Sequence, residues 1–230
     1  MGTESYTYTY YDSYRFDKRP MDVIQKEKLL RRLSPFVWSK TQDVISELRG
    51  MLEGYTDYQR LCLLYRMVTE NVKYDHSFKA SAYTYLAVLQ RRVGVCNGIA
   101  SLLFLLCGEC LDNTRCYHIH GNIGFDPEKH GHAWNMIELD TPGGRNIYFM
   151  DATWDLGGKK WDWFLVGDEK MRKGRIWESD RIPVAREQDY RGKVFKDEKK
   201  SAELSAWITR LGSRFDGSLY HLAKDKKTVG

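Results

Sequence analysis

The chain has 230 residues, with 36 lysines and arginines against 31 aspartates and glutamates, for a formal net charge of +5. Because the excess is small and both signs are interspersed, the composition does not support nucleic-acid binding. Aromatic residues make up 13% of the chain, which is apolar mass that disordered proteins lack. No stretch reaches the roughly 18 uninterrupted apolar residues of a membrane-spanning helix. The five cysteines are an odd number, so a closed set of disulfides would leave one thiol over.

The first 20 residues are a tyrosine-rich extension in which Tyr and Thr alternate over residues 6–10. This alternation is typical of a short strand, and an aromatic strip that binds sugar is the alternative. The segment has no apolar core of the kind that a signal peptide carries. We therefore expect a protein that is either cytoplasmic or exported with its signal removed.

The next segment has the apolar spacing of helices. Residues 23–33 predict one helix, which stops before Pro35, and residues 44–52 predict a second. Thr56 followed by Gln59 is a capping-box pattern, so a third helix is expected to begin there and to bury a stripe that runs to residue 72. These helices are interpreted as scaffold.

Another helix is predicted over 82–91, and the segment that follows it contains Cys96. Residues 99–106 are apolar on nearly every face, with Ser101 as the only polar break, which predicts a helix buried at the centre of a domain. Cys96 would lie at the N-terminus of this helix. The free N–H groups and the helix dipole there favour a thiolate and can stabilise an oxyanion. An inert buried cysteine is the alternative.

Beyond this helix the apolar period changes from helical to two. Strands are predicted over 116–123, 132–139 and 146–153, with a Thr-Pro-Gly-Gly turn at 141–144 that joins the last two as an antiparallel hairpin.

The hairpin brings two polar side chains together. His132 opens one strand and Asp151 closes the other, so the two lie at the same end of the pair. A cysteine nucleophile needs a nearby base, and the base needs a partner that fixes its tautomer. The hypothesis is a triad of Cys96, His132 and Asp151. A buried structural histidine is the alternative for His132.

Three blocks resemble the signature segments of the transglutaminase-like superfamily. They are residues 94–100 around Cys96, residues 131–135 around His132, and residues 151–155 from Asp151, in the family's order and spacing. Residues 71–75 are similar to the segment that closes the family's leading helix, and residues 163–166 and 168–171 resemble the segment that follows the aspartate in bacterial members. The resemblance covers roughly residues 57–180.

The resemblance implies an α+β, papain-like fold with a central buried helix packed on an antiparallel sheet, preceded here by an N-terminal helical region. It also implies acyl transfer through a thioester. Cys96 would attack a carbonyl, His132 would move the proton, and Asp151 would orient His132. The backbone N–H of Cys96 would be one oxyanion donor.

The family's second oxyanion donor is often an indole upstream of the cysteine, but this chain has no Trp between Trp38 and Trp134. Tyr83 and Asn97 are the candidates here. Trp134 is expected to pack beside His132 and to shield the ion pair from water. No cofactor and no metal are implied.

The favoured function is hydrolysis of a peptide or amide bond in a protein or peptide substrate, because no calcium-binding loop pattern is present. One alternative is a transglutaminase that cross-links Gln to an amine, and another is a non-enzymatic protein- or glycan-binding module. The sequence does not indicate an oligomeric state. The expected domains are an N-terminal extension (1–20), N-terminal helices (21–56), a catalytic core (57–180) and a C-terminal extension with one helix (181–230).

Two further clusters have structural interpretations. The cluster of Cys107, Cys110, Cys116, His118 and His120 has a spacing that matches no common zinc module, so buried free thiols are predicted. A zinc site and a Cys110–Cys116 disulfide are the alternatives. The charged residues 168–175 are interpreted as a solvated helix, with a wall of the substrate cleft as the alternative.

Overall fold

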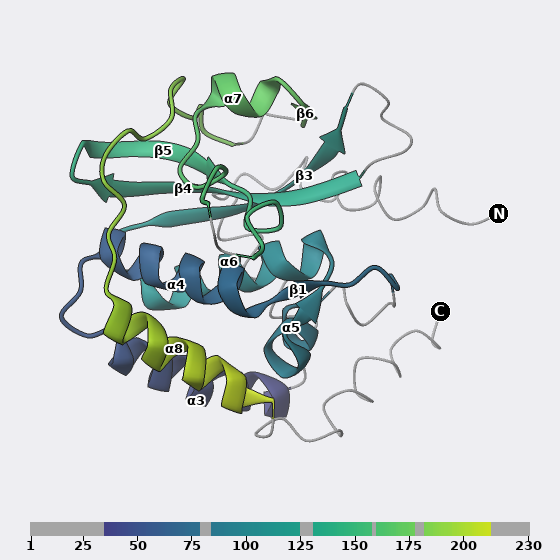
Figure 1. The fold of residues 1–230 in the computed structure, drawn as a ribbon, viewed down its shortest axis with the longest axis vertical. Coiled ribbons are helices and arrows are strands. Elements are labelled where there is room, and N and C mark those ends of the chain that lie inside the picture. The colour runs from purple at the N-terminus through teal and green to yellow at the C-terminus, as the bar shows by residue number, and fades with distance from the viewer. Residues whose placement is uncertain (1–34, 79–83, 125–130, 158–159, 178–181, 213–230) are drawn as a thin grey trace.

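The structure is a computed structural model that describes residues 35–78, 84–124, 131–157, 160–177 and 182–212 (Figure 1). The tyrosine-rich segment and the helix predicted over 23–33 lie outside these ranges. No helix within them is long and apolar enough to cross a membrane.

Helices and an antiparallel sheet make up the described part of the chain. The helices are α3 (Pro35–Met51), α4 (Asp57–Asn71), α5 (Tyr85–Arg91), α6 (Cys96–Cys110), α7 (Asp168–Arg172) and α8 (Glu198–Leu211). The sheet has the order β5-β4-β3-β6, formed by β3 (Arg115–Ile123), β4 (Gly131–Thr141), β5 (Gly144–Met150) and β6 (Arg175–Ile176). A separate parallel pair joins β1 (Lys73–Tyr74) to β2 (Val93–Gly94).

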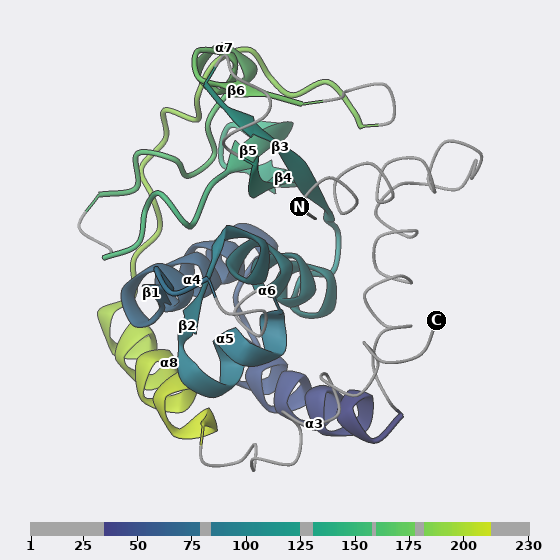
Figure 2. The same cartoon turned by 90° about the vertical axis from the view of Figure 1, so that its right-hand side faces the viewer.

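The elements are arranged in layers. Most helices lie on one side of the four-stranded sheet and α7 lies on the other (Figure 1). Helix α6 packs against β3 and β4 and is enclosed by α3, α4 and α5 (Figure 2). The fold is therefore α+β, with a central buried helix on an antiparallel sheet, as predicted. The division into four domains stays a prediction.

Apolar side chains fill both faces of the sheet. Ile137 and Leu139 of β4 join the core formed with the helices, while Trp134 and Met136 alternate to the other face. Trp177, just after β6, covers that second face with its ring 5.8 Å from the ring of Trp134. Burial on both faces fixes the register of β4, because a shift by one residue would exchange the two sets.

The capping-box prediction is confirmed at the start of α4. The Thr56 hydroxyl accepts from the Gln59 N–H at 3.3 Å, and the Gln59 side chain accepts from the Thr56 N–H at 3.0 Å. Helix α3 is longer than expected, because it begins at Pro35 rather than near residue 44. Proline is well suited to the first position of a helix, where its missing N–H removes no hydrogen bond.

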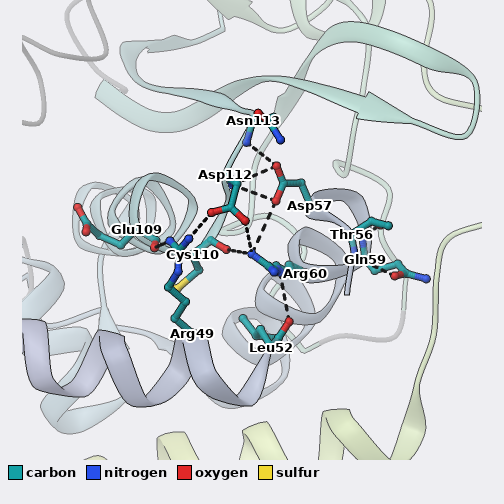
Figure 3. A network of polar contacts seen from close by, with 10 residues as sticks. All are labelled: Arg49, Leu52, Thr56, Asp57, Gln59, Arg60, Glu109, Cys110, Asp112 and Asn113. Carbon is teal, nitrogen blue, oxygen red and sulfur yellow. Dashed lines mark hydrogen bonds and ion pairs between the residues drawn. The ribbon is translucent and has the colours of Figure 1, made fainter. Parts of the chain in front are cut away.

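The carboxyl end of α6 is held by side chains from two other helices (Figure 3). Arg49 and Arg60 donate to the carbonyls of Glu109 and Cys110, at 2.7 and 3.1 Å. Asp57 accepts from the backbone N–H groups of residues 112–113. Cationic groups at the C-terminus of a helix stabilise it by satisfying its free carbonyls. This network fixes one end of α6, and Cys96 lies at the other.

Two further predicted element bounds are wrong. Strand β5 ends at Met150, so Asp151 follows the strand rather than closing it, and its N–H donates to the carbonyl of Trp163 at 3.0 Å. The solvated helix expected over 168–175 is only α7, which ends at Arg172. Arg175 instead lies on β6, where it pairs with β3 and is buried.

Candidate active site

Cys96 is the first residue of α6. Val95 is its extended N-cap, and Gly94 is held in place because its carbonyl accepts from the Asp75 N–H at 3.0 Å. Cys96 is half-buried, whereas the other four cysteines are buried. Because the first N–H groups of a helix have no partner within it, the start of α6 is a position that suits a negative charge. The predicted position of Cys96 is therefore confirmed.

His132 and Asp151 form a buried pair. His132 Nε2 lies 2.7 Å from Asp151 Oδ2, and the Asp151 side chain has no exposed surface. The N–H of Trp154 donates to Asp151 Oδ1 at 3.3 Å, which orients the carboxylate. The register pairs Asn135 with Met150, so the next residue of the chain brings Asp151 to the His132 end of the hairpin.

Cys96 lies close enough to His132 to act on its pKa, together with Asp151. Because Nε2 faces Asp151, the remaining ring nitrogen, Nδ1, is the one available to the thiol. Burial lowers the pKa of His132, but the hydrogen bond that His132 makes to Asp151 and the interaction with Cys96 outweigh it and raise the pKa to about 9. The structure thus pairs His132 with Asp151 and places Cys96 near enough to act on the same imidazole, while the complete triad stays a prediction.

We expect the ring protons of His132 to titrate with a midpoint near pH 9 in an NMR experiment, with the signal assigned by its loss in H132Q. D151N should lower the midpoint well below 9, because burial then acts without the carboxylate that opposes it. D140N is the matched control, since Asp140 is an exposed carboxylate of the same hairpin. A midpoint at or below pH 7 in the unaltered protein would contradict the pairing.

Arg175 is a buried site residue that the sequence did not reveal. Its Nη2 donates to Asp151 Oδ2 at 2.6 Å, so this oxygen accepts from both His132 and Arg175. The guanidinium lies 3.8 Å from the ring centroid of Trp163 and 5.1 Å from that of Trp154. The only hint in the sequence is that the charged run ends in the apolar pair Ile176-Trp177, which is typical of a strand rather than of a solvated helix.

Aromatic rings surround the pair. Trp134 is 1% exposed, and its ring centroid lies 5.7 Å from that of His132, so the expected packing of Trp134 beside His132 is confirmed. Trp154 is 52% exposed and contacts His132 edge-on at 6.5 Å. One indole therefore excludes water from the histidine, and another presents an open surface beside it.

The second oxyanion donor stays a prediction. Asn97 follows Cys96 in α6 and is half-buried, while Tyr83 lies outside the described residues.

A second buried carboxylate lies next to the triad. Asp155 accepts from the Tyr65 hydroxyl at 2.6 Å and from the Trp163 N–H at 3.0 Å. Burial raises the pKa of Asp155 to about 6. These bonds tie the loop after Asp151 to α4, so Asp155 supports the position of the triad carboxylate.

The cysteine and histidine cluster is structural. All five cysteines are free thiols, so the Cys110–Cys116 disulfide considered above does not form. Cys107 contacts Cys116 instead, which with burial raises the pKa of Cys107. The ring of His118 stacks on Phe104 of α6. Across the described ranges, no three His, Cys, Asp or Glu residues lie in a group that could hold a metal ion.

Comparisons with known proteins add little to this geometry. The sequence matches no protein-family model and no curated protein. It is similar to a crystal structure from Cytophaga hutchinsonii that is described as a candidate cysteine protease, with 24% identity over 50% of this chain and 37% of that one. The TM-score of this match is 0.36.

Proposed function

We propose that the chain is a cysteine-dependent acyl-transfer enzyme that hydrolyses a peptide or amide bond through a thioester. The observation that carries the proposal is the position of His132, which pairs with the buried carboxylate of Asp151 and lies near enough to Cys96 for the thiol to act on its pKa. The resemblance of the three sequence blocks to the transglutaminase-like superfamily supports the same chemistry.

The proposed reaction begins with the Cys96 thiolate attacking the carbonyl carbon, which forms a carbon–sulfur bond. The carbonyl oxygen becomes an oxyanion, and the backbone N–H of Cys96 at the start of α6 is placed to stabilise it. The His132 imidazolium then donates its proton to the departing amine, and a thioester remains.

Water resolves the thioester in the second half of the reaction. Neutral His132 removes a proton from water, hydroxide adds to the carbonyl, and the Cys96 sulfur leaves as the acid is released. Asp151 keeps the His132 ring in place through both halves and stabilises its charged form. The group that resolves the thioester decides between hydrolysis and amine transfer.

The proposal is tested by alkylation with iodoacetamide at pH 6, mapped by peptide mass. We expect Cys96 of the unaltered protein to react at least about 10-fold faster than Cys96 of H132Q. Without His132 to take its proton, the thiol of H132Q should behave as an ordinary thiol, which is almost fully protonated at pH 6 and reacts slowly. The four buried thiols of the folded protein serve as internal controls. Equal rates with and without His132 would remove the basis for an activated nucleophile.

The reaction class is tested by incubating the protein with casein and a labelled amine, with C96A as the blank. Casein cleavage that needs Cys96 supports hydrolysis. Amine incorporation that needs Cys96 would identify a transglutaminase instead, and neither reaction in a protein whose Cys96 is unreactive would favour a binding module.

A further inference from the structure

We propose that Arg175 is a positioning residue of the triad, which holds the Asp151 carboxylate and balances its charge. This inference rests on the proposed function, because it assigns a role to Arg175 at the same site. Arg175 touches neither the thiol nor the imidazole in the contacts described above, so it acts through Asp151.

The strand that carries Arg175 fixes the point from which its side chain extends. The backbone of Arg175 is fixed by the antiparallel pairing of Ile123 with Arg175 and of Asn122 with Ile176. Trp177, two residues further on, packs its ring against Phe149 at 5.0 Å. The side chain therefore starts from a rigid strand, and its Nη2 reaches Asp151 Oδ2 with little freedom to leave.

The buried charges of Asp151 and Arg175 balance each other. The side chains of Asp151 and Arg175 are 0% and 2% exposed. In the proposed reaction Cys96 acts as a thiolate beside the His132 imidazolium, so those two charges cancel and Asp151 alone would leave the group with a net negative charge. Arg175 supplies the compensating cation, which a buried carboxylate requires.

Tryptophan rings enclose the guanidinium of Arg175. The guanidinium lies 3.8, 5.1 and 6.0 Å from the ring centroids of Trp163, Trp154 and Trp134. Ring faces attract a guanidinium and exclude water from its hydrogen bonds. Water therefore competes poorly for Asp151, and the carboxylate has a single favourable orientation toward His132.

Other charged groups act on this site from each packed element. Cys96 and Asp151 act directly on His132. Tyr65 and Asp155 lie behind Asp151 and interact with it electrostatically, and Lys170 lies 5.0 Å from the Trp163 ring. These groups remain when Arg175 is replaced, so the change expected below comes from Arg175 itself.

Removing the positive charge of Arg175 should leave Asp151 free to attract the imidazolium more strongly. In R175Q we expect the NMR titration midpoint of His132 to rise by at least about half a pH unit. The turnover number of the hydrolysis should fall about 10-fold with KM within twofold, because a more basic imidazole is a weaker acid toward the leaving amine. K173Q is the matched control, since Lys173 is an exposed cation of the same segment that pairs with Glu169.

R175K keeps the charge and loses the planar fork. We expect its His132 midpoint to stay within about 0.3 pH units of the unaltered protein, and its turnover number to fall severalfold. R175K also decides the question if R175Q does not fold.

Either of two results would overturn the proposal: an unchanged or lower midpoint in R175Q, or an upward shift in R175K of the size expected for R175Q. The NMR measurement needs no substrate. If the His132 midpoints contradict the role of Arg175 while Cys96 is still alkylated rapidly, only the role of Arg175 is wrong. If Cys96 is unreactive in the unaltered protein, the proposed function is wrong.

Discussion

D151N is expected to lower the rate of casein hydrolysis by about 10³- to 10⁴-fold, because an amide cannot hold His132 in the required tautomer or stabilise its charge. The same substitution should lower the free energy of unfolding by about 3–5 kcal/mol, since it leaves the buried Arg175 without its counter-charge. The measurements are initial rates with matched substrate and urea denaturation followed by circular dichroism.

Two further variants separate these effects. D140N removes an exposed carboxylate of the same hairpin and should change the free energy of unfolding by less than about 0.5 kcal/mol. D151N/R175Q removes both buried charges and should be more stable than D151N, while remaining inactive. A D151N protein within tenfold of normal activity would show that Asp151 is not the partner that His132 needs.

G121A is expected to lower the melting temperature by roughly 5–10 °C, which corresponds to about 2–3 kcal/mol in a chain of this length. A Cβ at Gly121 would lie 2.3 Å from the carbonyl oxygen of Ile176 and 2.5 Å from the ring of Trp134. Both neighbours must move, and both belong to the site: Trp134 packs on His132, and Ile176 follows Arg175. Thermal melts followed by circular dichroism provide the measurement.

G108A is the matched control for this substitution. Gly108 lies within α6, and a Cβ there meets no atom within 4 Å. Alanine should therefore stabilise the protein by about 0.5–1 kcal/mol through its higher helix propensity. If G121A melts at or above the temperature of the unaltered protein, the close approach of β6 to β3 at Gly121 is wrong.

The positions of the triad residues followed from local patterns. The apolar run after Cys96 predicted a buried helix that begins at Cys96. The location of Cys96 in α6 was therefore determined by the local sequence pattern. Alternation and a Gly-containing turn likewise predicted the hairpin that carries His132 and Asp151. The bounds were less accurate, and Asp151 lies just past β5 because its N–H pairs with Trp163 rather than with the neighbouring strand.

The sequence by itself determined the buried helix with Cys96 at its N-terminus and the hairpin that carries His132 and Asp151, because each depends on periodicity within a few turns or strands. The α+β class followed from the resemblance of the three sequence blocks. Only the tertiary structure decided that Arg175 belongs to the same site. Its partner, Asp151, is 24 residues away, and its strand is two residues long, so no local pattern distinguishes it from the solvated arginines nearby. A buried charge is stable only where a counter-charge lies next to it. Here the counter-charge is distant in the sequence, so the two groups come together only in the folded chain.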